Sequence, residues 1–392
     1  MVAAAFIGPG TLTTAATTGA SSGLALAWTI LFALIATVTL QELAVRSALA
    51  TQRDLAALAR EFGGLIWGRW LVAPLIVAAI GIGNAAYQSG NLSGAAVGLT
   101  AFMPDRFASA VLSLSAVAVI LILGNRYHWL ERVLVALVVL MAVLFFGLAI
   151  MLMPEILSLS ADRLAPRFRS GDSLLVLALI GTTIVPYNLF LHATAARRRW
   201  QDAPLSEALR EARWESLVAI SIGATITLAI MAVAAVLLES PSNQSVLNAL
   251  IERVDDRLPG FSGLLIAIGL FAAGFSSALA APVAASWAVC GALGLSTDER
   301  STAFKTAALL VLSVGTGLAL VASRPQALIV TAQAANAMLL PVVAGILLLI
   351  ANSQLIPHPW RNGKLANLLA AAIILLVTAI AVSKMVALLS AS

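Results

Sequence analysis

Long apolar segments follow one another along the whole chain, and short links that carry most of the charged residues separate them. Each segment is apolar on all sides, whereas the strands of a membrane β-barrel alternate apolar and polar residues over about 10 positions. A helix of roughly 18 or more apolar residues crosses the hydrocarbon layer and satisfies its own backbone groups. The pattern therefore predicts eleven helical spans, at about residues 2–20, 24–50, 70–98, 108–124, 130–153, 173–196, 215–238, 261–293, 302–322, 326–351 and 366–388.

The composition agrees with a multi-pass membrane protein. Hydrophobic residues make up 61% of the chain, charged residues make up 10%, and the mean hydropathy is +1.00. A soluble domain averages about 45–50% apolar and about 25% charged residues. No link is long enough to form a soluble domain, so we predict a single transmembrane domain over residues 1–392 in a bacterial-type inner membrane. The lone cysteine, Cys290, lies in an apolar segment, which disfavours disulfides and a thiolate metal site.

The basic residues of the links predict the orientation. The net charge is +5, and these basic residues lie in the short links, so they indicate topology rather than nucleic-acid binding. With the amino terminus in the cytoplasm, the internal links carry fourteen Lys and Arg residues and the external links carry seven. The run Arg197-Arg198-Arg199 is the largest single contribution to this bias. We therefore predict a cytoplasmic amino terminus.

Two of the predicted spans are interrupted. Gly8-Pro9-Gly10 breaks the first span, and Val185-Pro186-Tyr187 breaks the sixth. Proline removes a backbone donor and clashes with the preceding turn, and glycine loosens the backbone further. Matching breaks in the two halves of a transporter mark its binding site, although a pair of simple kinks is the alternative interpretation. The seven residues before Gly8 provide only about 10 Å of helix, so the first half-helix is either short or begins upstream of Met1.

The residues around both breaks resemble the Nramp family of divalent-metal transporters. The similar stretches are Gly8-Pro9-Gly10 with residues 19–23 (GASSG), residues 40–44 (LQELA), residues 180–192 (IGTTIVPYNLFLH) and residues 272–277 (AAGFSS). The resemblance extends over nearly the whole chain and implies an all-α membrane protein with the leucine-transporter fold. That fold has two inverted five-helix repeats, expected here at 1–153 and 173–351, with an additional eleventh helix at 366–388 and with spans one and six broken.

The residue types with which this family holds its metal are absent. The family carries Asp-Pro-Gly-Asn at the first break and Met-Pro-His at the second. In this chain Gly8 replaces the aspartate, Thr11 the asparagine and Val185 the methionine. Span 70–98, where the family has an acidic proton-relay pair, contains no acidic residue. A divalent cation needs anionic or strongly donating ligands to replace its water, so these departures disfavour the usual cargo.

The leading interpretation of the departures is a secondary transporter of a small inorganic anion, with bicarbonate as the specific prediction. Helix amino ends carry partial positive charge and unpaired N–H groups, and no aspartate neutralises the end near Thr11. The alternative is a divalent-metal transporter for Mn, Mg or Fe with a remodelled site. The expected substrate-binding residues are Gly8, Gly10, Thr11, Thr14, Thr182, Val185, Tyr187 and Asn336.

Two further predictions concern the driving ion. Ser276 and Ser277, with Gly8, form a candidate sodium site, because transporters of this fold often place hydroxyl ligands at that point of span eight. The alternative is that both serines are small packing residues. His192 is a candidate proton relay and equally a candidate for a plain helix contact.

Other classes of function find little support. A channel would need a continuous polar stripe or a charged ring, and a membrane enzyme would need a nucleophile and a base within the spans. The sequence contains no Walker loop, no HExxH motif and no Cys/His cluster. We expect no enzyme activity and no cofactor, with Na⁺ as the one candidate coupling ion. The expected partners are a small inorganic ion and the lipid bilayer, with no nucleic acid and no obligatory protein partner.

Overall fold

The computed structural model describes residues 8–62, 64, 68–101, 106–124, 127–238, 246–260, 262–322 and 324–389, and every regular element within them is a helix. The longer elements are α2 (Pro9–Ser22), α3 (Trp28–Thr51), α7 (Gly83–Leu99), α8 (Phe107–Gly124), α9 (Tyr127–Met151), α12 (Ser173–Thr183), α13 (Pro186–Arg199), α14 (Leu205–Leu237), α15 (Val246–Arg257), α16 (Ser262–Leu293), α17 (Thr302–Val321), α18 (Pro325–Asn352) and α19 (Lys364–Leu389). The shorter ones are α4 (Leu55–Glu61), η1 (Gly68–Val72), α6 (Ala73–Ile76), η2 (Val77–Ile82), α10 (Met153–Leu157), α11 (Ala161–Leu164), η4 (Ser170–Asp172) and η5 (His358–Trp360).

Ten helical stretches among the described residues are long and apolar enough to cross a membrane. They correspond to ten of the eleven predicted spans. Nine agree with the prediction within four residues at each end, whereas α14 begins at Leu205, ten residues before the predicted start of span 215–238. Only the part of the first span after its break is described, as α2, and residues 2–7 lie outside the described part. The third span, Trp70–Leu99, runs without interruption through the π-helical segments η1 and η2 into α7.

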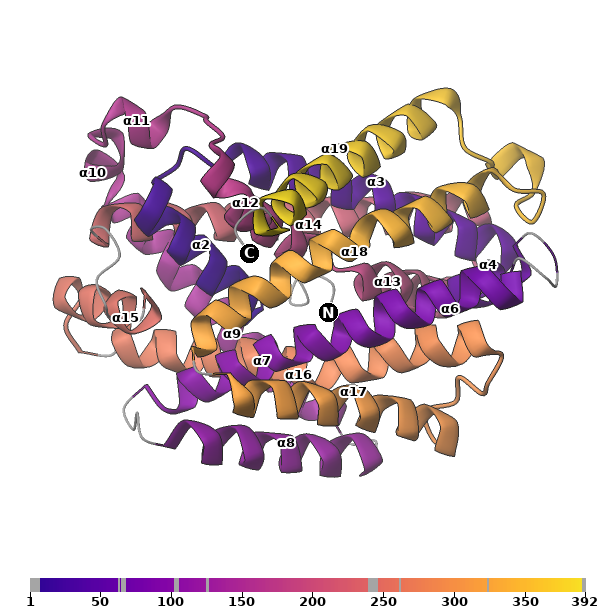
Figure 1. The fold of residues 1–392 in the computed structure, drawn as a ribbon, viewed down its shortest axis with the longest axis horizontal. Helices are drawn as coiled ribbons and strands as arrows, with labels where there is room; N and C mark the ends of the chain where they lie inside the picture. The colour runs from indigo at the N-terminus through magenta and orange to yellow at the C-terminus, as the bar shows by residue number, and fades with distance from the viewer. Residues whose placement is uncertain are drawn as a thin grey trace.

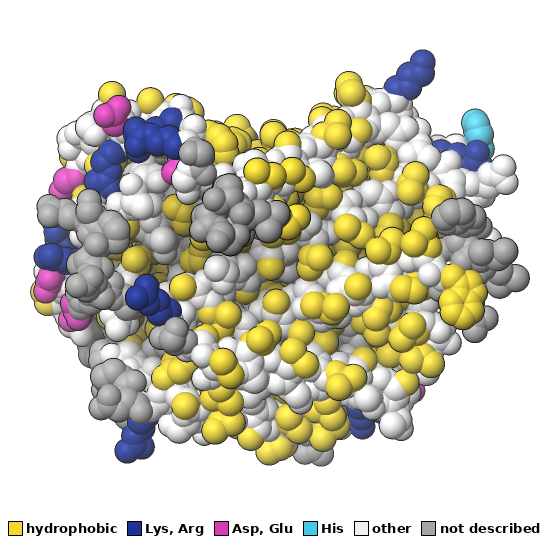
Figure 2. Space-filling view, viewed as in Figure 1, with side chains coloured by type: hydrophobic (Ala, Val, Ile, Leu, Met, Phe, Trp, Pro, Cys, Tyr) yellow, Lys and Arg dark blue, Asp and Glu magenta, His cyan; other side chains and the backbone are white. Residues whose placement is uncertain are grey.

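The outer surface has the distribution expected of a bilayer protein. Large apolar side chains are exposed on the outer helices, among them Ile120, Val143, Leu310 and Leu375. Figure 2 shows hydrophobic side chains over the broad middle of one face and charged side chains towards the ends. Such a surface would associate in water, so it indicates contact with lipid.

The helices form a core of tilted, mutually packed spans with further helices on the outside (Figure 1). Helix α7 is central and packs against α16, α17 and α18, while α2 packs against α14 and α12 against α18. Helix α8 lies along one edge beside α17, and α19 covers α18 on another side. The short helices α10, α11 and α15 gather at one end of the molecule. The two broken helices, α2 and α12–α13, are therefore enclosed by other spans.

One glycine explains how closely the interior helices approach. A Cβ atom at Gly181 of α12 would overlap the backbone carbonyl of Gln333 on α18. Small residues at helix contacts allow this kind of backbone approach in membranes. Gly181 therefore fixes the packing of α12 against α18.

A proline in α16 has a partner on α7. Pro282 lacks an N–H group, so the carbonyl of Ala278, one turn earlier, loses its helical donor. The side-chain Nε2 of Gln88 donates to that carbonyl over 2.9 Å. Gln88 is fully buried, and a freed carbonyl in the membrane interior needs such a donor. This hydrogen bond ties α7 to α16 beside the broken helices.

Candidate functional site

The structure shows the predicted break in the sixth span and, at the first break, the start of α2. Gly8 caps α2 with an extended backbone (φ −95°, ψ 175°), and the helix starts at Pro9. In the sixth span α12 ends at Thr183, two residues follow outside the helices, and α13 starts at Pro186. Proline is suited to the first turn of a helix, where its missing N–H group would have no partner. The two breaks thus place the amino ends of α2 and α13 inside the protein.

A hydrogen bond connects the two breaks directly. The hydroxyls of Thr11 on α2 and Thr182 on α12 lie 2.8 Å apart, and both residues are buried. The neighbouring Thr13 instead donates to the carbonyl of Pro9, and Thr183 donates to that of Leu179. Of these four threonine hydroxyls, two are therefore used within their own helices, and the other two join the halves of the molecule.

Two tyrosines stand beside the first break. The ring centroids of Tyr87 on α7 and Tyr187 on α13 lie 5.7 Å apart, and both residues are buried. A Cβ atom added to Gly8 would lie 3.4 Å from the Tyr87 hydroxyl and 3.5 Å from the Ser277 hydroxyl, which is ordinary contact distance. The space next to Gly8 therefore has a polar wall and admits a small side chain.

Carboxamides without hydrogen-bond partners lie next to both breaks. Both polar atoms of Asn188 and of Gln333 are buried and unpartnered, as are Nδ2 of Asn336 and the hydroxyl of Thr14. Asn188 is in the first turn of α13, and Gln333 lies against the backbone of Gly10, where a Cβ atom would overlap its carboxamide. A buried polar group without a partner costs about 1–3 kcal/mol. Several of them in one region indicate a site that water or a ligand completes.

The structure places the predicted substrate-binding residues around this region. Gly8, Gly10, Thr11, Thr182 and Tyr187 lie at the breaks through the contacts just described. Their roles in binding stay a prediction. The same holds for Thr14, one turn further along α2, for Asn336 on α18, and for Val185, a buried apolar residue at the N-cap position of α13.

Sequence reasoning missed Tyr87, Asn188 and Gln333 as site residues. A signal for Gln333 was present, because it stands three residues before Asn336 in an apolar span, which puts both carboxamides on one helix face. Polar residues inside a membrane span face the protein interior and mark functional paths.

The predicted sodium residues differ in their surroundings. Ser277 is buried and faces the space beside Gly8, as the distance above shows. The hydroxyl of Ser276 donates to the carbonyl of Ala273 within α16. The Gly8 carbonyl accepts the N–H groups of Thr11 and Leu12. Of the three, the Ser277 hydroxyl is thus the group best placed for an ion.

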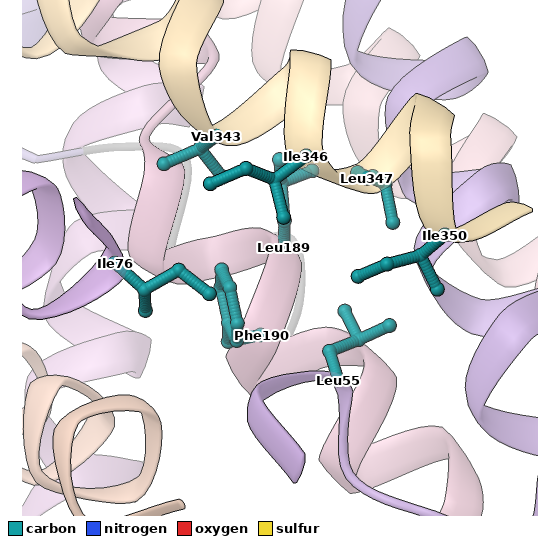
Figure 3. Close-up of a pocket in the computed structure, with 8 residues that line it drawn as sticks. All are labelled: Leu55, Ile76, Leu189, Phe190, Val343, Ile346, Leu347 and Ile350. Atoms are coloured by element: carbon teal, nitrogen blue, oxygen red, sulfur yellow. The ribbon is translucent and has the colours of Figure 1, made fainter. Parts of the chain in front are cut away.

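An apolar contact closes the space between α13 and α18 on one side of the second break. Leu189 and Phe190 of α13 face Val343 and Ile346 of α18, with Leu55 beside them (Figure 3). The void between these side chains measures only about 10 Å³. This void has room for one water molecule at most and offers it no polar partners, so we expect it to be dry.

His192 lies one turn beyond Asn188 on α13. Its Nε2 atom is 2.8 Å from the hydroxyl of Ser216 on α14, and its Nδ1 atom has no partner. The histidine therefore contacts a neighbouring helix, as one interpretation expected, and the proton-relay role stays a prediction.

Comparison with known proteins identifies the relatives of this chain. The family model described as "Natural resistance-associated macrophage protein-like" (Nramp) matches residues 1–387. The divalent metal cation transporter MntH of Bacillus subtilis is 26% identical over 71% of the chain, and that of Ralstonia nicotianae is 24% identical over 94%. The matched region covers 66% of the Bacillus protein, just under two thirds, and 85% of the Ralstonia protein.

Solved structures confirm the predicted fold. A manganese transporter from Eremococcus coleocola aligns with a TM-score of 0.75 at 19% identity, covering 97% of this chain and 83% of that one. The nucleobase-cation-symport-1 family transporter Mhp1 aligns with a TM-score of 0.54 at 14% identity, covering 98% of this chain and 91% of that one. The fold is the leucine-transporter fold, with two inverted five-helix repeats, and the predicted boundaries of the repeats stay a prediction.

The bicarbonate prediction is wrong in the light of these relatives. They are named divalent metal cation transporters, and the structural neighbour is a manganese transporter, so the findings favour the alternative of a remodelled metal site. The error came from treating the loss of the aspartate at Gly8 as the loss of cation binding. Buried carboxamide and hydroxyl oxygens are cation ligands too. The carboxamide oxygens of Gln333 and Asn188 were not among the candidate ligands predicted from the sequence.

Proposed function

Because the chain belongs to the Nramp family, we propose that it is a secondary transporter of a divalent metal cation, which it binds between the two helix breaks with part of the water shell in place. The observation that carries this proposal is the group of unpartnered oxygens and amides of Asn188, Gln333 and Thr14 beside the breaks, in a chain whose relatives are named metal transporters. The names of the relatives support a divalent metal cation as the cargo. The neutral donor groups support the proposal that the ion keeps part of its water shell when it binds.

The donor chemistry favours hard cations. The oxygens around the breaks are neutral hydroxyl and carboxamide oxygens, and the described residues contain no group of three His, Cys, Asp or Glu side chains that could hold a metal. Mg²⁺ gives up its water reluctantly and usually keeps several water molecules when bound, and oxygen ligands suit Mg²⁺ and Mn²⁺. We infer that Gln333, Asn336 and Asn188 contact the ion largely through its water.

The substrate-binding roles follow from position. Thr11 and Thr182, joined across the two breaks, orient their oxygens at the meeting point of the two halves. Thr14 and Gln333 offer free acceptors on α2 and α18, and Asn188 does so at the start of α13. A neutral site of this kind binds a divalent ion more weakly than a carboxylate site would, because no full charge offsets the ion's own.

Sodium coupling is a subordinate proposal. The Ser277 hydroxyl next to Gly8 is the group that supports it. Uptake that is unchanged when choline replaces sodium would overturn it and would leave the metal proposal intact.

The experiment is uptake of Mn²⁺ and Mg²⁺ into proteoliposomes, followed with a metal-sensitive dye inside the vesicles. The matched pair is Thr14→Val and Thr13→Val. Thr14 has a free hydroxyl, whereas the Thr13 hydroxyl is bound to the carbonyl of Pro9. We expect Thr14→Val to reduce uptake at least fivefold and Thr13→Val to leave it within twofold of the unmodified protein.

A folded protein that moves neither ion would overturn the proposal. Equal effects of the two valine variants would show that the free hydroxyl of Thr14 is not part of the site. Monodisperse elution of each variant in detergent serves as the control for folding.

A further inference from the structure

The far end of α13 carries the run Arg197-Arg198-Arg199, whose side chains reach three different neighbours. Arg197 pairs with Asp54 ahead of α4, Arg198 lies over the Trp287 ring of α16, and Arg199 pairs with Glu215 of α14. Helix α13 is the half-helix that follows the second break. Contacts of charged side chains therefore hold this half-helix at the end away from the break.

The ion pair between Arg197 and Asp54 is better shielded than the one formed by Arg199. Nη2 of Arg197 lies 2.9 Å from Oδ1 of Asp54, and the two side chains are 25% and 26% exposed, whereas that of Arg199 is 65% exposed. The hydroxyl of Thr194, one turn earlier on α13, donates to the same oxygen over 3.4 Å. Water and salt weaken an exposed ion pair more than a shielded one. The contact with Asp54 is thus the stronger of these two ion pairs.

The residue after Asp54 belongs to the apolar contact of Figure 3. Leu55 is 3% exposed and lines the same void as Leu189 and Phe190 of α13 and Ile346 of α18. The ion pair and the apolar contact therefore involve consecutive residues of one segment, and both join that segment to α13. If α13 moved away from Asp54, its apolar side chains would also leave Leu55, and the space between α13 and α18 would open.

The connections of the two partners indicate which of them moves. Helix α13 follows two residues, Ile184 and Val185, that lie outside the helices, and such short segments at element ends serve as hinges. Helix α4 instead packs closely on α16, because a Cβ atom added to Gly291 would lie 2.9 Å from the Cβ atom of Ala56. We therefore expect α13 to move and α4 to stay with α16.

We propose that the ion pair between Asp54 and Arg197 is a latch that holds α13 closed against α4 and α18. Its release opens a path from the second break to the end of the molecule at which the arginine run lies, between the side chains that now close the space (Figure 3). Passage of a metal ion along this path rests on the function proposed above. The latch itself does not depend on the identity of the cargo.

Reactivity of a thiol within the apolar contact tests the latch. In a Cys290→Ala background, Ile346→Cys places a thiol where the native side chain is 8% exposed. A charged, membrane-impermeant methanethiosulfonate reagent is added to the protein in nanodiscs. We expect Asp54→Ala to raise the rate of thiol modification at least fivefold, because it removes the ion pair. Asp54 makes no capping hydrogen bond to α4, so the start of that helix loses no hydrogen bond.

The matched control is the neighbouring ion pair between Arg53 and Glu61, which does not involve α13. Arg53→Ala should leave the modification rate of Ile346→Cys within twofold. Arg197→Ala breaks the latch from the other side, so it should give the same increase as Asp54→Ala. The reversed pair, Asp54→Arg with Arg197→Asp, should bring the rate back to within twofold of the unmodified latch.

A thiol at a fully buried position separates opening from unfolding. Ser286→Cys on α16 should stay unreactive when Asp54→Ala is added. Equal rates in the Asp54→Ala and Arg53→Ala variants would overturn the proposal, and so would an increase at position 346 that position 286 shares. Labelling needs no transport, so a protein that moved no metal ion would disprove the proposed function and still give a clear result for the latch.

Discussion

Gly8 is the position at which this chain differs most in charge from the family pattern. A Cβ atom there would make ordinary contacts with Tyr87 and Ser277, so a small side chain is accommodated without rearrangement. We therefore predict that Gly8→Asp tightens Mn²⁺ binding at least tenfold, about 1.4 kcal/mol, because a carboxylate replaces water on the ion. Isothermal titration in detergent measures the change.

Gly8→Ala is the matched control for this prediction. It adds the same Cβ atom beside Tyr87 and Ser277 but no charge, so it should leave Mn²⁺ affinity within twofold. If the alanine and aspartate variants bind alike, Gly8 does not face the ion, and the site lies elsewhere along α2.

Single residues also mark the limit of what the sequence could predict. The breaks at Gly8 and Val185 were readable because glycine and proline act locally on their own helices. The sequence could not show that the carboxamides of Gln333 and Asn188 are free, because a carboxamide in an apolar span gives no sign of whether its hydrogen bonds are satisfied. Gln88, for example, is equally buried, yet its side chain donates a hydrogen bond to the Ala278 carbonyl, which has no helical donor because of Pro282. Only the packing of α7 on α16 separates the two cases.

Helices were more predictable than their contacts. Apolar runs predicted nine spans close to their observed ends, since helix length in a bilayer is set by its thickness. They missed the first ten residues of α14, which include charged side chains and extend the helix beyond its apolar part. The ion-pair partners of the run Arg197-Arg198-Arg199 could not be predicted from the sequence. Arg197, expected from sequence to act as a topology signal, also forms a 2.9 Å ion pair with Asp54 ahead of α4. An ion pair between two helices depends on how α13 lies against its neighbours in the fold, and the periodicity of apolar residues does not contain this information.

The contact of α12 with α18 leads to a stability prediction. Gly181→Ala would drive a Cβ atom into the backbone carbonyl of Gln333, which cannot rotate away as a side chain could. We expect a loss of about 1–3 kcal/mol of unfolding free energy, the usual cost of overpacking. The midpoint of thermal unfolding in detergent should fall accordingly.

Gly147 of α9 provides the comparison for this contact. It is an exposed helical glycine with no atom within 4 Å of an added Cβ. Gly147→Ala should be neutral or stabilising by up to about 1 kcal/mol through helix propensity. Equal melting of the two alanine variants would mean that α12 and α18 are less closely packed than Gly181 indicates.

The molecule as a whole is a multi-pass membrane protein whose apolar middle is bounded by charged ends (Figure 2). That surface fixes the plane of the membrane but not which end faces the cytoplasm. The excess of basic residues in one set of links, fourteen against seven, is the argument for a cytoplasmic amino terminus. The same argument puts Arg213 and the run Arg197-Arg198-Arg199 on the cytoplasmic side, because they belong to those links.

Two exposed positions at opposite ends of the molecule test this orientation. Ser158 follows α10 and Gln201 follows α13, so in a Cys290→Ala background Ser158→Cys and Gln201→Cys each carry one accessible thiol. A membrane-impermeant maleimide applied to intact cells should label Ser158→Cys and reach Gln201→Cys only after the membrane is opened. The reverse pattern would invert the whole topology, since the ten helices fix one end relative to the other.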